Sequence, residues 1–210
     1  MPNEPLQFGQ YYHIYNRGNN RESLFVEARN YPHFLRLYAR HIQPIAQTFA
    51  YCLLINHFHF FIRTYTEEEQ EQYYLTRRLV QSSEIEPISP FKLRRPSRAF
   101  NNMFIAYARA FNKATNRTGA LFETPFGREI VDSDAYFLTL IAYIHRNPQK
   151  HSLVGDFREW KWSSFSTFLS SKPTKVERDE VLAWFGGLDA FLDWHVTDVD
   201  EMIIAPLLLD

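Results

Sequence analysis

Cysteine is nearly absent from this sequence, and two other features are missing with it. Cys52 is the one cysteine in 210 residues, so no internal disulfide can form and a reducing cytoplasm is the expected compartment. The opening residues MPNEPLQFGQ contain neither a basic nor an apolar segment, so no signal peptide is predicted. No apolar run approaches the roughly 20 residues that a membrane span needs. These absences predict a soluble intracellular protein.

A net charge of one sign is also absent, because the formal charge is −1. The sum hides an asymmetry. Residues 77–128 hold ten Lys and Arg against three acids, a net +7, whereas residues 155–210 hold five against eleven, a net −6. A basic centre is typical of proteins that bind a polyanion. Charges that merely solvate exposed faces explain the asymmetry equally well.

Hydrophobic residues make up 45% of the chain and aromatic residues 17%, which is enough for a sizeable core. Period-two alternation predicts strands, and helical spacing of apolar residues predicts helices. The expected elements, in order, are a strand at 10–16, a helix at 28–42, strands at 48–55 and 57–65, a helix at 98–116, an extended segment at 121–131 and a helix at 133–148. This order predicts an α+β fold with a ferredoxin-like or RRM-like antiparallel sheet and helices on one side.

Composition changes near residue 155, which predicts a main domain at 1–154 and an accessory segment at 155–210. The segment contains a linker around SSKPTK, followed by short helices. The part to about residue 168 is expected to pack on the main domain, and the part beyond the linker to form a small C-terminal helical appendage. Truncation after Ser170 is therefore expected to leave a folded protein with altered activity. Elsewhere, residues 66–72 are expected to be exposed and residues 82–98 to form a loop, and Pro148 marks the approximate end of the last helix of the main domain.

The stretch INHFHFFIR places His57 and His59 inside an apolar run. In a strand these two side chains share a face, while Phe58 points into the core. Two imidazoles on one face can bind a metal ion together, or they can be ordinary polar residues on a wet sheet face. The pattern His-x-His alone favours the second explanation.

A third ligand and a reacting group are available in the stretch YIHRNP. Tyr143 and Asn147 are four residues apart, so they lie one turn apart on the same helix face. An amide oxygen from Asn147 can complete a three-ligand site beside Tyr143. The alternative is that Tyr143 is a core aromatic residue and Asn147 a helix cap. His145 is expected to pack or cap rather than to touch a ligand.

Several blocks of the sequence together resemble one known family. They are YYHIYNRGNN near the start, INHFHFFI, ARAFNKATNRTGALFETPF, YIHRNP followed by QKHSLV, and WKWSSF, which span about residues 10–168 in order. The series resembles the REP-associated tyrosine transposases, a branch of the single-tyrosine HUH transposases of prokaryotes. Two details depart from the family pattern: Ile55 stands where proline is usual, and FETPFGREI replaces a commoner block. The second can alter DNA contacts.

The resemblance implies a role for each matching residue. His57 and His59 match the two metal ligands of the HUH motif, Asn147 matches the third ligand, and Tyr143 matches the nucleophile. The implied activity is metal-dependent cleavage and rejoining of single-stranded DNA through a 5′-phosphotyrosine, acting on hairpin-forming repeats in transposition. Two imidazoles and one amide oxygen suit Mg²⁺ or Mn²⁺.

The expected partner is single-stranded or hairpin DNA, without a membrane, in the prokaryotic cytoplasm at the nucleoid. Plausible DNA contacts are Asn16, Arg17, Arg94, Arg95, Arg98, Arg109, Lys113, Arg117 and Arg128. Both a monomer and a homodimer are compatible with the resemblance. Three alternatives stay open: a non-cleaving RRM-like nucleic-acid-binding module, a domesticated transposase, and a rolling-circle replication initiator. A zinc hydrolase is disfavoured because the sequence lacks His-Glu-x-x-His.

Overall fold

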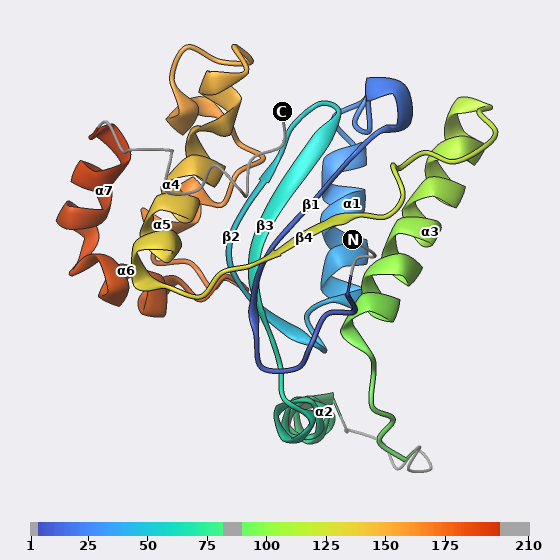
Figure 1. Ribbon diagram of the computed structural model, residues 1–210, viewed down its shortest axis with the longest axis horizontal. Coiled ribbons are helices and arrows are strands. Elements are labelled where there is room, and N and C mark those ends of the chain that lie inside the picture. Colours follow the sequence, from blue (N-terminus) through green and yellow to red (C-terminus); the bar gives the residue numbers. More distant parts are fainter. Residues whose placement is uncertain (1–3, 82–89, 198–210) are drawn as a thin grey trace.

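Four antiparallel strands form one sheet in the computed structural model, which describes residues 4–81 and 90–197. The strands are β1 (Tyr11–Arg17), β2 (Ala46–Leu53), β3 (His57–Thr64) and β4 (Gly127–Ile130). They lie side by side in the order β2-β3-β1-β4 (Figure 1). This order, with α1 between β1 and β2 and α3 before β4, is the ferredoxin-like arrangement. The predicted α+β fold class is confirmed.

One face of the sheet is covered by two helices, α1 (Asn30–His41) and α3 (Pro96–Thr115) (Figure 1). Both helices turn an apolar stripe towards the strands, and Phe34 of α1 is fully buried there. Phe58 and Phe60 of β3 belong to the same core, because alternate residues of a strand project from one face.

The opposite face is also covered, so helices lie on both sides of the sheet rather than on one. Phe49 and Phe61 are fully buried on this second face. A sheet with apolar residues on both faces needs two covering layers. The cover consists of α4 (Asp134–Lys150), α5 (Phe165–Phe168), α6 (Arg178–Phe185) and α7 (Leu188–Val196) (Figure 1).

The C-terminal segment shares this second core instead of standing apart from it. Val181 and Phe191 are fully buried in one cluster with Phe49 and Phe61. The segment also bonds to the edge strand β2, where the Leu53 N–H donates to the Trp162 carbonyl (3.0 Å). Because of this packing, truncation after Ser170 is no longer expected to leave a folded protein.

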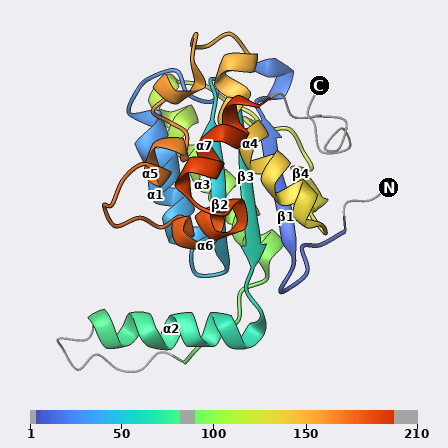
Figure 2. The same ribbon diagram turned by 90° about the vertical axis from the view of Figure 1, so that its left-hand side faces the viewer.

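A helix that was not predicted follows β3. The segment 66–72 opens α2 (Glu67–Gln81), which projects away from the rest of the chain (Figure 2). Thr66 and Glu69 form a capping box: the Glu69 N–H donates to Thr66 Oγ1 (3.2 Å) and the Thr66 N–H donates to Glu69 Oε2 (2.8 Å). The TEEE stretch therefore carried a helix-start signal that its high charge obscured.

Two further predictions concern helix ends. Pro148 lies inside α4, which ends two residues later at Lys150, so the proline marks that end only approximately. The predicted loop at 82–98 is only partly observable. Residues 82–89 lie outside the described residues, and α3 has already begun at Pro96.

A buried pair of histidines joins α7 to α4. His145 Nδ1 lies 2.8 Å from His195 Nε2, and His145 Nε2 lies 2.8 Å from Ser164 Oγ. His195 Nδ1 donates to the Phe191 carbonyl at 2.7 Å. His145 is fully buried, which supports the packing role expected for it. Burial lowers the pKa of His195 to about 4 and holds that of His145 well below its usual range.

Stability is expected to fall as the pH drops from about 6.5 towards 4. The unfolded chain binds a proton at each histidine near pH 6.5, whereas folded His195 stays neutral down to about pH 4, so acid favours unfolding. His195 alone should contribute about 3 kcal/mol of this loss. Urea denaturation followed by tryptophan fluorescence between pH 7 and 4 measures it. His195→Gln should show a shallower pH dependence than wild type, and an equal slope would contradict the assignment.

Candidate active site

The histidine pair lies where strand alternation predicts it. His57 and His59 project from the face of β3 that α4 covers, while Phe58 points into the core under α1 and α3. The two imidazole ring centres are 5.2 Å apart. His59 is completely buried and only 9% of His57 is exposed. The alternative of two polar residues on a wet sheet face is therefore wrong.

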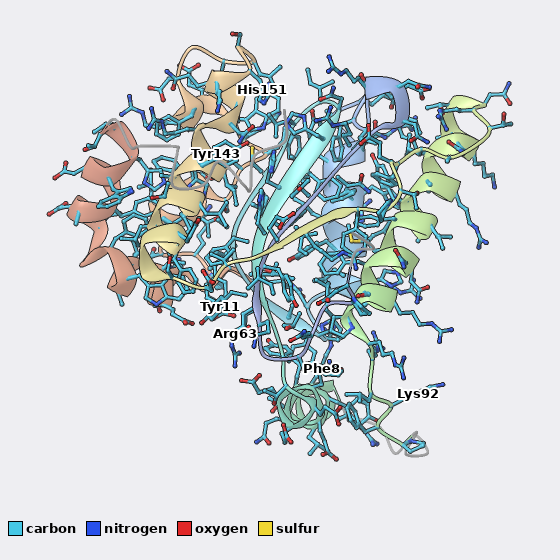
Figure 3. All side chains as sticks on the ribbon, viewed as in Figure 1. Phe8, Tyr11, Arg63, Lys92, Tyr143 and His151 are labelled. Atoms are coloured by element: carbon cyan, nitrogen blue, oxygen red, sulfur yellow. The ribbon has the colours of Figure 1, made fainter. Side chains whose placement is uncertain are left out.

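Helix α4 brings Tyr143 and Asn147 against these histidines. The Tyr143 ring packs edge-on against His59, with ring centres 5.6 Å apart. Asn147, one turn later, is completely buried, and its Nδ2 donates to the Tyr143 carbonyl at 3.3 Å. His151 follows after another turn, with its ring centre 4.8 Å from that of His57. Figure 3 shows Tyr143 and His151 at the same part of the molecule, on the sheet side of α4.

A neighbouring amide determines which nitrogen of His57 carries the proton. Asn56 Nδ2 faces the Arg21 carbonyl at 3.4 Å, so Asn56 Oδ1 is the atom that faces His57 Nδ1, at 2.7 Å. A carbonyl oxygen can only accept, so His57 Nδ1–H donates to it. The lone pair of neutral His57 is therefore at Nε2, where a metal ligand needs it.

Two buried polar atoms at the site have no hydrogen-bond partner among the described residues, namely His59 Nε2 and Asn147 Oδ1. A buried polar atom without a partner is costly, and a bound cation would satisfy both. Burial lowers the pKa of His57 to about 4, with His151 lowering it further and Asn147 opposing the change. Burial also holds the pKa of His59 well below its usual range. Both imidazoles are thus neutral near pH 7 and able to act as ligands.

The chemistry of the donors limits the kind of metal site. In the part of the chain that the structure describes, no group of three or more His, Cys, Asp and Glu side chains is arranged to hold a metal ion. A site at this place therefore depends on the amide oxygen of Asn147 beside the two imidazoles. This mixed nitrogen and oxygen set, with the two unsatisfied atoms, fits the predicted Mg²⁺ or Mn²⁺.

A second tyrosine and a lysine flank the site. Tyr15 lies on the same sheet face as His59, with ring centres 6.3 Å apart. Its ring lies directly over Gly127 of β4, where an added Cβ would meet it at 2.0 Å, so this position requires glycine. Lys150 Nζ lies 5.2 Å from the centre of the Tyr143 ring.

Arg17 Nε lies 3.9 Å from Glu123 Oε2, and three other predicted DNA contacts are engaged more fully within the protein. Asn16 is buried and bonds to the Glu123 carbonyl and to the neighbouring Arg17 N–H. Arg117 pairs with Glu22 through Nε at 2.7 Å and also bonds three carbonyls of its own loop. The Arg128 guanidinium lies over the Phe126 ring at 3.9 Å. The structure does not favour these three side chains as DNA contacts.

The remaining predicted contacts fall into two groups. Arg17 lies at the site, because it pairs with His57 across the β1–β3 ladder. Helix α3 covers the sheet face opposite to α4. The other predicted contacts are exposed just before α3 or on it, namely Arg94, Arg95, Arg98, Arg109 and Lys113. The structure therefore brings His57, His59, Tyr143, Asn147 and Arg17 together and leaves the α3 group on the other side of the sheet.

Sequence reasoning missed three residues that contact the predicted ligands. Asn56 stands in the INHFHFFI stretch, and His13 in the YYHIYNRGNN stretch, so both were within the recognised blocks. His13 Nε2 lies 2.9 Å from His59 Nδ1. His151, four residues beyond Asn147, stands in the recognised block QKHSLV and is the C-cap of α4.

Comparison with known proteins supports the fold alone. No protein-family model and no curated protein matches the sequence. Among solved structures, the chain is similar to a REP-associated tyrosine transposase bound to a REP hairpin, with a TM-score of 0.52 and 14% sequence identity. The similarity covers 83% of this chain and 90% of the other. At this identity it shows a shared fold and leaves the chemistry to be argued from the site.

Proposed function

We propose that the chain is a tyrosine transposase that cleaves and rejoins single-stranded DNA at hairpin-forming repeats. The observation that carries the proposal is the contact of the Tyr143 ring with His59, beside the unsatisfied oxygen of Asn147. The shared fold with a hairpin-bound tyrosine transposase supports the same function. No described helix has the length and apolar character needed to cross a membrane.

The cleavage step assigns a role to each residue of the site. The Tyr143 oxygen attacks the phosphorus of a phosphodiester as the bond to the 3′ oxygen breaks. The phenol proton is lost to solvent and the 3′ oxygen takes one up, which yields a 5′-phosphotyrosine and a free 3′-OH. A phenol has a pKa of about 10 and is a weak nucleophile without help. A divalent ion held by His57, His59 and Asn147 would offset the charge that builds on the phosphate oxygens.

The surroundings of Tyr143 suit a reversible reaction. Tyr143 is 5% exposed, and its ring lies edge-on against His13 and His59, which restricts the positions that its oxygen can take. Arg17, which pairs with His57 in the ladder, and Lys150, near the Tyr143 ring, add positive charge around the site, which favours an approaching phosphate. Because the phosphotyrosine retains the energy of the phosphoester, the free 3′-OH can attack it and rejoin the strand without ATP.

All four proposed residues come from one chain, so a partner subunit is not needed to complete the site. We infer that a monomer suffices for cleavage, in the cytoplasm of a prokaryote. A domesticated protein that has kept the cleavage chemistry is included in this proposal, because its site would be the same.

The alternative of an RRM-like binding module is weakened by the packing. Such modules bind nucleic acid on an open sheet face, but here α1 and α3 cover one face and α4 to α7 the other. A rolling-circle initiator remains the second candidate. Tyr15 near His59 and Lys150 near Tyr143 supply the second tyrosine and the lysine that are frequent in that class.

The test is direct detection of the covalent product. Wild-type protein is incubated with a labelled single-stranded repeat from beside its own gene and Mn²⁺, and the adduct is resolved on a denaturing gel. A band that is sensitive to protease and requires the metal supports the proposal. Binding of the DNA without any adduct, over a range of repeat strands, would favour the non-cleaving module.

DNA binding is expected to weaken steeply with salt. If about five phosphates are neutralised, the slope of log K against log salt is roughly −3.5 on a single strand. Arg109→Gln with Lys113→Gln should reduce the slope to roughly −2, because two contacts are lost. The slope is measured by fluorescence anisotropy at salt concentrations from about 50 to about 300 mM.

The matched control removes two exposed lysines from the acidic C-terminal segment. Lys161→Gln with Lys172→Gln changes the net charge equally and should leave the slope unchanged. If Arg109→Gln with Lys113→Gln has the same slope as wild type, α3 does not contact the DNA.

A further inference from the structure

A third histidine, His13 on β1, contacts the predicted metal ligand His59. His13 is completely buried, and its Nε2 lies 2.9 Å from His59 Nδ1. The two rings stack with centres 5.1 Å apart and an angle of 18° between their planes. In the β1–β3 ladder His59 pairs with Tyr15, so His13 is its diagonal neighbour on the same face. His13 therefore touches the nitrogen of His59 that faces away from a bound cation.

The position of one proton decides whether His59 can bind a metal. A neutral imidazole has one N–H and one lone pair. If His59 carries its proton at Nε2, its Nδ1 accepts from His13 Nε2–H, and no lone pair of His59 is left for a metal. If the proton is at Nδ1, it is donated to His13 Nε2, and the lone pair at His59 Nε2 is directed away from His13. Only the second arrangement offers a ligand atom.

We propose that His13 is a positioning residue that accepts the Nδ1–H of His59 and so prepares His59 Nε2 for the metal. The inference rests on the proposed function, because the metal site belongs to it. With this contact, each of the two histidine ligands donates its Nδ1–H to its own acceptor. Asn56 Oδ1 holds His57 from the adjacent position, and His13 Nε2 holds His59 from the neighbouring strand. Partners of this kind typically change metal affinity by about 10- to 100-fold.

The first measurement is Mn²⁺ binding by calorimetry to the full chain. Wild type should bind one Mn²⁺, and His13→Phe, which fills the space without an acceptor, should bind about 10- to 100-fold more weakly. His13→Gln, which restores an acceptor oxygen, should recover part of the loss. His41→Gln removes a partly exposed imidazole from α1 and should bind like wild type, which controls for adventitious binding by histidine.

The second measurement uses wild type alone, so it does not depend on the folding of a variant. Long-range ¹⁵N–¹H NMR on metal-free wild type identifies the protonated nitrogen of His59 from its two ring nitrogens. The proposal requires a proton at Nδ1 and a lone pair at Nε2. A proton at Nε2 would overturn it.

The two hypotheses fail in different ways. If wild type does not bind Mn²⁺, the proposed function and this inference both fall. If wild type binds Mn²⁺ and His13→Phe binds it equally well, the inference is wrong while the proposed function stands.

Discussion

Replacing Tyr143 by phenylalanine is expected to abolish the covalent protein–DNA adduct and to leave DNA binding within about two-fold of wild type. The substitution removes one oxygen and keeps the ring, so the edge-on contact with His59 is retained. The phenol oxygen is the attacking atom in the proposed reaction, and phenylalanine has no other nucleophile. The adduct is measured on a denaturing gel with Mn²⁺, and binding is measured by anisotropy in the same buffer.

Tyr15→Phe is the matched control, because Tyr15 lies on the same sheet face with its ring centre 6.3 Å from that of His59. It should form the adduct at a rate close to wild type. If Tyr143→Phe still forms an adduct and Tyr15→Phe does not, the nucleophile is Tyr15. If both variants form less adduct than wild type, a two-tyrosine mechanism of the rolling-circle type becomes the better explanation.

Truncation after Ser170 is expected to prevent cooperative folding, in contrast to the result that composition alone predicts. The deletion removes four apolar side chains from the second core: Val176, Val181, Phe185 and Phe191. At about 1.5–3 kcal/mol for each buried side chain, the loss is about 6–12 kcal/mol, which is comparable to the whole stability of a typical domain. Circular dichroism during urea denaturation measures the result. A truncated chain with a sharp transition near that of wild type would restore the domain boundary at 154.

A single substitution tests the same packing without a deletion. Phe191 is completely buried against Phe165 and Phe168, so Phe191→Ala should lower the free energy of unfolding by about 3–5 kcal/mol. Val196→Ala, at a side chain that is 66% exposed on the same helix, should change it by less than about 0.5 kcal/mol. Similar effects of the two substitutions would show that α7 is not part of the cooperative core.

The elements of the fold were accessible from the sequence wherever local periodicity was strong. Alternation in INHFHFFIR correctly placed His57 and His59 on one face of β3 and Phe58 on the other. Helical spacing correctly placed Tyr143 and Asn147 one turn apart on α4. The charged helix α2 was missed because it has few apolar residues, and its capping box was the one local signal.

The second core joins the C-terminal segment to the sheet across the predicted boundary at residue 154. A change of composition near residue 155 suggested a boundary, but composition does not show which surface a segment covers. Phe49 and Phe61 require a cover on the second face of the sheet, and the aromatic residues of the C-terminal segment supply it. Which apolar face packs on which is a long-range property, since it depends on contacts between residues more than a hundred positions apart.

By itself, the sequence determined the strongly periodic strands and helices but not α2, the order that makes the sheet ferredoxin-like, and the faces on which His57, His59, Tyr143 and Asn147 lie. These follow from local geometry, because a strand repeats every two residues and a helix every 3.6. Only the tertiary structure decided that α4 lies over β3, that both histidines are buried, and that His13 and Asn56 each hold one of them. Those relations depend on the packing of elements that are distant in the chain, and no local period encodes that packing.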